Sequence, residues 1–177
     1  PSTGETLACV SYPGYDNNRL ANNMETDSYR KLHKDLSPPF YNKATQERTA
    51  PGSTFKPVTA IAGLSEGVIT DNDYIYCGGR FDKLQGAPLN CWLLSGHGAL
   101  SIRDGIANSC NVFFSETAYR LGQNEEGTFN DNAAMQKLIK YANLLGLDKK
   151  SGLEISEASP QVSNELPIPS AIGQGTH

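Results

Sequence analysis

Apolar residues recur at helical spacing in several stretches of the chain. Residues 53–65 are apolar around most of a helix circumference, which predicts a central, buried helix. Pro57 is compatible only with the first turn, so this helix begins near Ser53, and Gly67 is a plausible end. Its apolar positions are Phe55, Val58, Ile61, Ala62 and Leu64.

Three more helices are predicted further along. The stretch "SIRD" at 101–104 has the side chains of a capping box, so a helix begins at Ser101 and ends near Asn108. Helical spacing resumes over 112–122 and again over 133–146. The last of these helices is amphipathic, and its predicted buried stripe is Met135, Leu138, Ala142 and Leu145.

Strand signals are shorter. Alternation over 4–10, before Pro13 and Gly14, predicts a strand in which Cys9 is a small core residue. Residues 17–40 are polar and predict a long connection with one short helix, and the irregular stretch 71–99 contains strand-like pieces such as "YIYCGG". A short strand is also expected at "SGLEI", 151–155.

Composition narrows the function class. The 177 residues are 38% hydrophobic and 19% charged, as in a globular domain with its own core. The net charge is −4 without a basic cluster, which argues against a nucleic-acid or anionic-membrane surface. No apolar run approaches the roughly 20 residues that span a bilayer. Four cysteines are too few for a disulfide scaffold of this length.

The first candidate for chemistry is Ser53 with Lys56. Residues three apart share a helix face, so the amine can reach the hydroxyl. A serine becomes a nucleophile when a base takes its proton, and a lysine serves as that base when burial lowers its pKa. The same pattern arises by chance in many proteins. A second copy, Ser28 to Lys31, lies in a basic, polar stretch without an apolar run and is interpreted as solvated surface.

A second motif strengthens this interpretation. Ser109, Cys110 and Asn111 form a polar break between two predicted helices, 56 residues after Ser53. Ser109 could relay a proton between Lys56 and a leaving group, while Asn111 could bind a substrate amide and hold the lysine. The alternative is an ordinary linker, since serine and asparagine are common there.

Together these motifs identify a family resemblance. "TAPGSTFKP", "HGALSIRDGIANSCNVFF", "LLGLDKKSGLEI" and "AIGQG", with the opening "TGETLACVSYPGYDNN", resemble the transpeptidase domain of class B penicillin-binding proteins, most of all the penicillin-binding protein 2 branch of cell elongation. The resemblance covers nearly the whole chain. It implies an α/β (α+β) fold: an antiparallel sheet flanked by helices, with a helical subdomain at about 53–146 of a partial domain spanning 1–177.

The resemblance also implies roles. Ser53 would be the acylated nucleophile, Lys56 its general base, and Ser109 and Asn111 the second catalytic motif, with Asn111, Gly173 and Gln174 contacting substrate. The substrates would be peptidoglycan stem peptides ending in D-Ala-D-Ala, and β-lactams would acylate Ser53 as mimics. Full-length relatives carry one N-terminal membrane anchor, act on the extracytoplasmic face of the membrane and work with a SEDS-type glycan polymerase.

One family feature is not found. The third motif, a Lys-Thr/Ser-Gly strand, is expected after "AIGQGTH", where the sequence stops. The literal match Lys150-Ser151-Gly152 precedes the "GQG" segment and is rejected. We therefore expect this chain to be truncated before the third motif and either to be a poor catalyst alone or to be accompanied by the missing part.

Cys77, Cys91, His97 and Cys110 form a candidate metal site. Their spacing contains no C-x-x-C pair, but three thiolates and an imidazole complete a tetrahedral structural zinc set. Some members of the penicillin-binding protein 2 branch are similar here, with a metal that ties the loop after the first helix to the second motif. A Cys77–Cys91 disulfide, or buried free thiols, remain alternatives.

Two other functions are compatible with the motifs. A β-lactam sensor domain would use the same acylation without cross-linking, although the opening segment and the metal-like set favour the synthase. A non-catalytic interaction fragment would fold without binding any β-lactam.

Overall fold

The computed structural model describes residues 2–84 and 88–175, which divide into two compact units. The first, here called the N-terminal unit, consists of Pro1–Arg48 and Ser151–Ala158. The second, here called the helical unit, consists of Thr49–Lys150 and Ser159–His177. All residues of the two candidate sites belong to the helical unit.

The N-terminal unit has little regular structure. It contains the short helices α1 (Asn17–Ala21), α2 (Thr26–Lys34) and α3 (Lys43–Gln46). The predicted long connection over 17–40 therefore holds two helices rather than one. The chain segment 151–158 is tied to α3, since the Gln46 amide donates to the Ser156 carbonyl at 2.7 Å and the Ala158 amide donates to the Thr45 carbonyl at the same distance.

Two predicted strands are absent from the described residues. Over 4–10 no neighbouring segment pairs with the backbone, so Cys9 is exposed rather than a core residue, and Leu7 and Val10 are each 80% exposed. Over 151–155 the carboxylate of Glu157 accepts from the amides of Ser151 and Gly152, which forms a local turn in place of a ladder. Alternation predicts a strand only where a partner strand exists.

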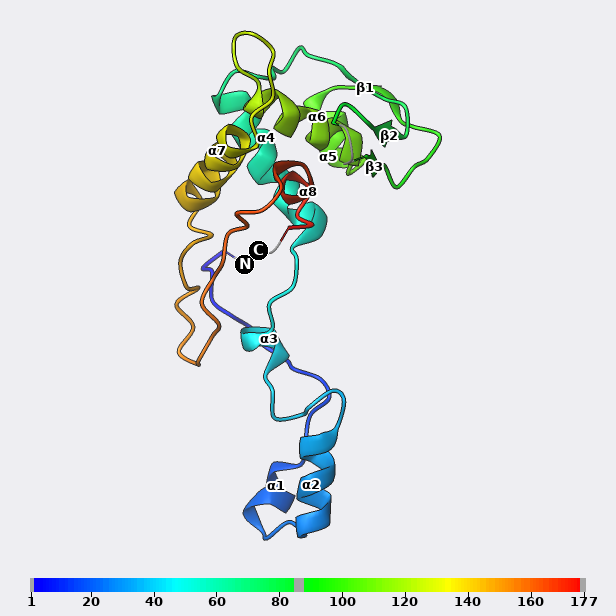
Figure 1. Ribbon diagram of the computed structural model, residues 1–177. Helices are drawn as coiled ribbons and strands as arrows, with labels where there is room; N and C mark the ends of the chain where they lie inside the picture. The colour runs from blue at the N-terminus through cyan, green and yellow to red at the C-terminus, as the bar shows by residue number, and fades with distance from the viewer. Residues whose placement is uncertain (1, 85–87, 176–177) are drawn as a thin grey trace. The chain divides into compact units, whose positions relative to one another are not determined.

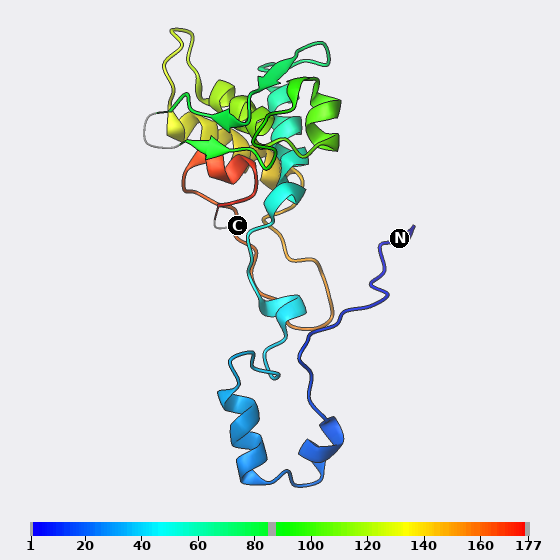
Figure 2. The same ribbon diagram turned by 90° about the vertical axis from the view of Figure 1, so that its right-hand side faces the viewer.

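The helical unit is built around α4 (Lys56–Ser65), preceded by the 3₁₀ turn η1 (Gly52–Phe55), and around α6 (Asn111–Gly122). These two helices pack against each other, and α7 (Asp131–Leu144) and α8 (Pro167–Ala171) cover them (Figures 1 and 2). The apolar run of the first predicted helix explains this central place: Phe55, Val58 and Ala62 are buried, whereas Ile61 and Leu64 remain 40% exposed.

In the part of the helical unit that the structure describes, the strands form two short antiparallel pairs. Strand β1 (Ile75–Cys77) pairs with β4 (Gly98–Leu100), and β2 (Arg80–Phe81) pairs with β3 (Leu89–Asn90). β1, β2 and β3 lie against α6 (Figure 1). The short strands carry Cys77 on β1 and bring Cys91 directly after β3.

The predicted helices are confirmed with small changes. α5 (Ile102–Ala107) begins after Ser101, whose side chain and Asp104 form the expected capping box. Along α7, Met135, Leu138 and Ala142 are buried as predicted, but Leu145 is 49% exposed because it lies at the C-cap, where the helical register ends. No helix in the described ranges has the length and apolar character required to cross a bilayer.

Candidate active site

Lys56 is the buried centre of the first site. It is the first residue of α4 and only 2% exposed. Its amine lies within hydrogen-bond distance of four oxygens: the Ser109 carbonyl at 2.6 Å, Asn111 Oδ1 at 2.7 Å, Ser109 Oγ at 2.9 Å and Ser53 Oγ at 3.1 Å. The structure therefore brings the four residues of the two sequence motifs together around one nitrogen.

Ser53 lies on η1, in the turn that leads into α4. Its side chain is exposed, one turn from the buried Lys56 amine. Gly52, the residue before Ser53, helps to fix this turn: it has φ +59°, and its backbone amide donates to the Gly173 carbonyl at 2.8 Å. A reactant can thus reach the hydroxyl from solvent while the amine behind it stays shielded.

Ser109 occupies a special position at the end of α5. Its φ of +49° is left-handed, and its amide donates to the Ile106 carbonyl at 3.0 Å. The next amide, that of Cys110, donates to the Gly105 carbonyl at 2.9 Å. These two bonds form a Schellman motif with serine at the position where glycine is usual. The turn directs both the carbonyl and the hydroxyl of Ser109 toward Lys56.

Asn111 begins α6 and faces the same amine. Its Oδ1 atom accepts from Lys56, and its Nδ2 atom donates to the Asn90 carbonyl at 3.2 Å. The second bond fixes which end of the side-chain amide faces Lys56. The acceptor end is therefore held toward the amine, and Asn111 helps to orient its protons.

Protonation of Lys56 is coupled to this geometry. Burial lowers the pKa of Lys56, an effect partly opposed by the Cys110 and Cys91 thiols when they are ionised. An ammonium has three protons for the four oxygens around it. When neutral, the amine donates to the Ser109 carbonyl and to Asn111, and its lone pair is free to accept the Ser53 proton. The arrangement can thus activate a hydroxyl without moving heavy atoms.

The hydroxyl of Ser109 completes the chain of polar groups. It donates to Ser53 Oγ at 2.8 Å while its own oxygen accepts from Lys56. A proton can therefore pass between Lys56 and Ser53 either directly or through Ser109. This is the connectivity that acyl transfer from an alcohol nucleophile requires.

Gly173 and Gln174, predicted to contact substrate, lie at the end of α8. Gly173 is buried with φ +72°, and a Cβ atom there would stand 2.0 Å from the Gly52 carbonyl oxygen. Gln174 is exposed, and its amide donates to the Pro169 carbonyl at 2.9 Å. Gly173 therefore lies against the turn that carries Ser53, where it shapes the backbone beside that hydroxyl.

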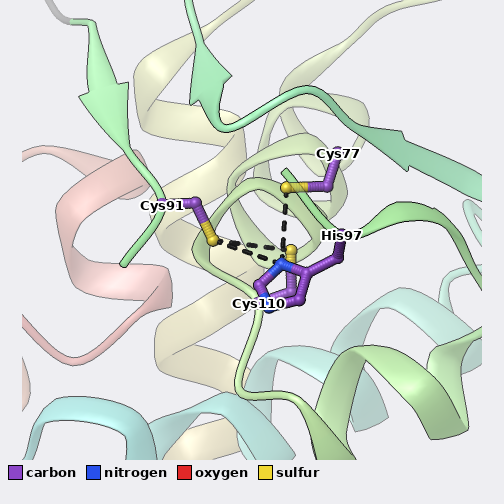
Figure 3. Close-up of side chains that lie close together, drawn as sticks. All are labelled: Cys77, Cys91, His97 and Cys110. Atoms are coloured by element: carbon purple, nitrogen blue, oxygen red, sulfur yellow. Dashed lines mark hydrogen bonds between the residues drawn. The ribbon is translucent and has the colours of Figure 1, made fainter. Parts of the chain in front are cut away.

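The second site gathers Cys77, Cys91, His97 and Cys110, whose sulfur and nitrogen atoms all lie within 4.8 Å of one another (Figure 3). His97 Nδ1 lies 3.6 Å from both the Cys77 and Cys91 sulfurs, and the sulfurs of Cys91 and Cys110 are 3.9 Å apart. Tetrahedral zinc with ordinary bond lengths requires edges of about 3.6 Å between sulfur and nitrogen and about 3.8 Å between sulfurs. The three distances fit such an ion.

The surroundings of the site shift the pKa values of two of its thiols. Although burial opposes ionisation of Cys91, backbone amides of Leu93, Asn111 and Val112 donate to its sulfur and bring its pKa below the ordinary value. Burial instead raises the pKa of Cys110 to about 12. The two thiols are therefore shifted in opposite directions, and a bound cation would favour the thiolate form of all three cysteines.

The structure adds two residues that the sequence did not single out. Asn90 contributes its carbonyl to Asn111, and the Trp92 indole N–H donates to the Asn108 carbonyl at 2.9 Å. Both flank Cys91 in the stretch "NCW". The sequence signal for them was their position next to a predicted ligand. A contact made by a backbone carbonyl does not depend on the type of residue, so no sequence pattern predicts it.

Known proteins share this arrangement of sequence and fold. The family described as the penicillin binding protein transpeptidase domain matches residues 1–176. Peptidoglycan D,D-transpeptidase MrdA of Haemophilus influenzae is 31% identical over 158 residues, covering 89% of this chain and 22% of the relative. Stage V sporulation protein D of Bacillus subtilis is 31% identical over 161 residues, covering 88% of this chain and 20% of the relative. The chain thus spans about a fifth of these relatives.

Solved structures agree. PBPA of Mycobacterium tuberculosis matches with a TM-score of 0.81 and 26% identity, over 99% of this chain and 40% of that one. PBP2 of Pseudomonas aeruginosa in complex with WCK 5153 matches with a TM-score of 0.79 and 25% identity, over 99% of this chain and 41% of that one. The expected transpeptidase fold is confirmed, and the chain belongs to the transpeptidase-domain family of penicillin-binding proteins.

Proposed function

We propose that this chain carries the nucleophile and the general base of a peptidoglycan D,D-transpeptidase that works through a serine acyl-enzyme. The observation that carries the proposal is the contact of the buried Lys56 amine with Ser53, Ser109 and Asn111. The names of the relatives support the reaction class, since the MrdA proteins are peptidoglycan D,D-transpeptidases.

In the proposed reaction, neutral Lys56 takes the proton of Ser53, whose oxygen attacks the carbonyl carbon of the penultimate D-Ala. The bond to the terminal D-Ala breaks, and its nitrogen receives the proton through Lys56 or Ser109. An amine of a second stem peptide then attacks the ester, gives up a proton and restores Ser53. A β-lactam would follow the first half of this path and remain attached. Asn111 and the exposed Gln174 would contact the peptide.

The test is labelling with a fluorescent penicillin, followed by a cross-linking assay with stem peptides, on the full-length protein. Ser53→Ala should abolish labelling. Ser28→Ala, in the second copy of the pattern on α2, should not. Labelling that survives Ser53→Ala would falsify the assignment. Labelling without cross-linked product would instead identify a β-lactam sensor.

A structural zinc ion is proposed for the second site. The spacing of its donor atoms and the amide bonds to the Cys91 sulfur support this choice, with Cys77, Cys91, His97 and Cys110 as ligands. The ion would link the strands to the loop of Ser109 and Asn111 and would take no part in acylation. We expect about one zinc per chain in protein purified without added metal. Less than about a tenth, with Cys77 and Cys91 cross-linked, would reject it.

Location and partners complete the proposal. The full-length protein would be anchored in the membrane by a segment outside this chain and act on its extracytoplasmic face, where peptidoglycan is made. A glycan polymerase of the SEDS type would supply its substrate strands. One structural neighbour, 28% identical, comes from a study of polymerization and crosslinking by a peptidoglycan synthase complex. Co-purification of a polymerase with the tagged full-length protein from solubilised membranes would test this.

A further inference from the structure

Three consecutive residues, Asn90, Cys91 and Trp92, contact the loop that carries Ser109 and Asn111. The Asn90 carbonyl accepts from the side-chain Nδ2 of Asn111, and the Cys91 sulfur accepts from the backbone amide of the same residue. The Trp92 indole donates to the Asn108 carbonyl. We call residues 90–92 the brace segment. It contacts the loop on both sides of Ser109, from the last turn of α5 to the first residue of α6.

The loop needs external support because its conformation is unfavourable. A left-handed φ at a residue other than glycine is costly, and Ser109 adopts φ +49°. The two Schellman bonds of Ser109 and Cys110 are local to α5, and the first of them holds, through the Ser109 N–H, the planar peptide that joins Asn108 to Ser109. The Asn108 carbonyl is the other polar end of that peptide, so a donor bonded to it from outside α5 adds a second restraint on the direction in which the chain enters Ser109.

The Trp92 side chain that donates to this carbonyl is held in place by a ring contact. Its ring packs edge-on against His97, with centroids 5.1 Å apart, although 62% of the residue is exposed. A side chain this exposed buries little apolar area and therefore contributes little to the stability of the core. The indole N–H, which is the polar atom of the side chain, is bonded to the Asn108 carbonyl. We therefore attribute the place of Trp92 to orientation of the loop rather than to burial.

We propose that Trp92 is a positioning residue for the acylation of Ser53, because its indole N–H holds the peptide between Asn108 and Ser109 so that the Ser109 carbonyl and hydroxyl face Lys56. This inference rests on the proposed function for its catalytic consequence, while its structural part is independent of it. Trp92 touches neither Ser53 nor Lys56 by any contact described above, so it acts through Ser109.

The variant that isolates the bond is Trp92→Phe, which keeps an aromatic ring against His97 and removes the donor. We expect the rate constant of acylation by penicillin at saturation to fall about three- to tenfold, as expected for one hydrogen bond, while the dissociation constant of the initial complex stays unchanged. Tyr74→Phe, at a residue 68% exposed next to β1, is the matched control and should alter neither.

Hydrogen exchange tests the loop itself. In Trp92→Phe of the full-length protein, the amides of Ser109 and Cys110 should exchange about three- to tenfold faster, while those of α7 keep their protection. Zinc content and melting temperature should remain those of the parent. Unchanged exchange at the loop overturns the proposal. So does faster exchange throughout the helical unit, because that result identifies a general loss of stability.

The two proposals fail in different ways. If the parent protein is not acylated by penicillin, the proposed function is wrong, and loop exchange still decides whether Trp92 holds the turn. If the parent is acylated and Trp92→Phe reacts at the parental rate, the proposed function stands and the positioning role is wrong.

Discussion

The Ser109 hydroxyl donates a hydrogen bond to the Ser53 hydroxyl at 2.8 Å, although 56 residues separate them in the chain. The same oxygen of Ser109 accepts from Lys56. Ser109 makes both contacts from a left-handed backbone conformation, with φ +49°. Glycine would adopt this turn at a lower cost than serine does, so stability and the proposed role of Ser109 conflict at this residue.

This conflict predicts the behaviour of two variants. Ser109→Gly and Ser109→Ala both remove the hydroxyl, so acylation should slow in both. Because alanine retains the left-handed strain, the glycine variant should be more stable to urea than the alanine variant by about 1 kcal/mol. Equal stability of the two variants would show that the turn at Ser109 is not strained in solution.

Lys56 predicts a pH dependence for acylation. In the proposed reaction the base is the neutral amine, and burial lowers the pKa of Lys56, so the rate should rise with pH and level off below the ordinary lysine value of about 10.4. Lys56→Arg, which stays charged, should lower the rate by at least about a hundredfold at all pH values. A midpoint at or above the ordinary value would contradict the role of burial.

Glu66 predicts a pH dependence of stability. Hydrogen bonds from Lys140 at 2.7 Å and Tyr141 at 2.9 Å join the end of α4 to α7 and lower the pKa of Glu66. A lowered carboxyl pKa stabilises the fold above the unfolded-state pKa, and this contribution is lost as pH falls through the folded-state value. Glu66→Gln should therefore cost about 1 kcal/mol at neutral pH, with a difference from the parent that shrinks in acid.

The control for this effect is Glu126→Gln, in the exposed loop before α7, which should leave the denaturation curve unchanged at every pH. If Glu66→Gln lowers the free energy of unfolding by the same amount in acid as at neutral pH, the charge of Glu66 is not what stabilises the contact between α4 and α7.

Gly173 predicts a steric effect on the turn beside Ser53. An alanine Cβ would collide with the Gly52 carbonyl at 2.0 Å and also require φ +72°. Gly173→Ala should cost about 3 kcal/mol of unfolding free energy and slow acylation, because the turn before Ser53 must shift. Gly127→Ala, at φ +79° with open space around it, isolates the backbone strain and should cost only about 1 kcal/mol. Equal costs in chemical denaturation would exclude the collision.

Local signals allowed much of the fold to be predicted from the sequence. The capping box of Ser101 and Asp104 and the apolar spacing of α4, α6 and α7 depend on residues within a few turns of each other. The strand predicted over 4–10 was wrong because pairing with another strand is not a local property. The predicted burial of Leu145 was wrong because the helix ends one residue before it. Contacts made by backbone carbonyls, such as those of Asn90 and Asn108, have no residue-type signal.

What the sequence determined by itself is the pairing of Ser53 with Lys56: they fall one helical turn apart, and that spacing alone allows the hydroxyl and the amine to meet. Only the tertiary structure decided what surrounds them. The packing of α4 against α6 excludes water from Lys56, and a strained turn held by residues 90–92 delivers Ser109 and Asn111 to it. Burial and long-range contacts set the pKa of an amine, and neither is encoded within one turn of helix.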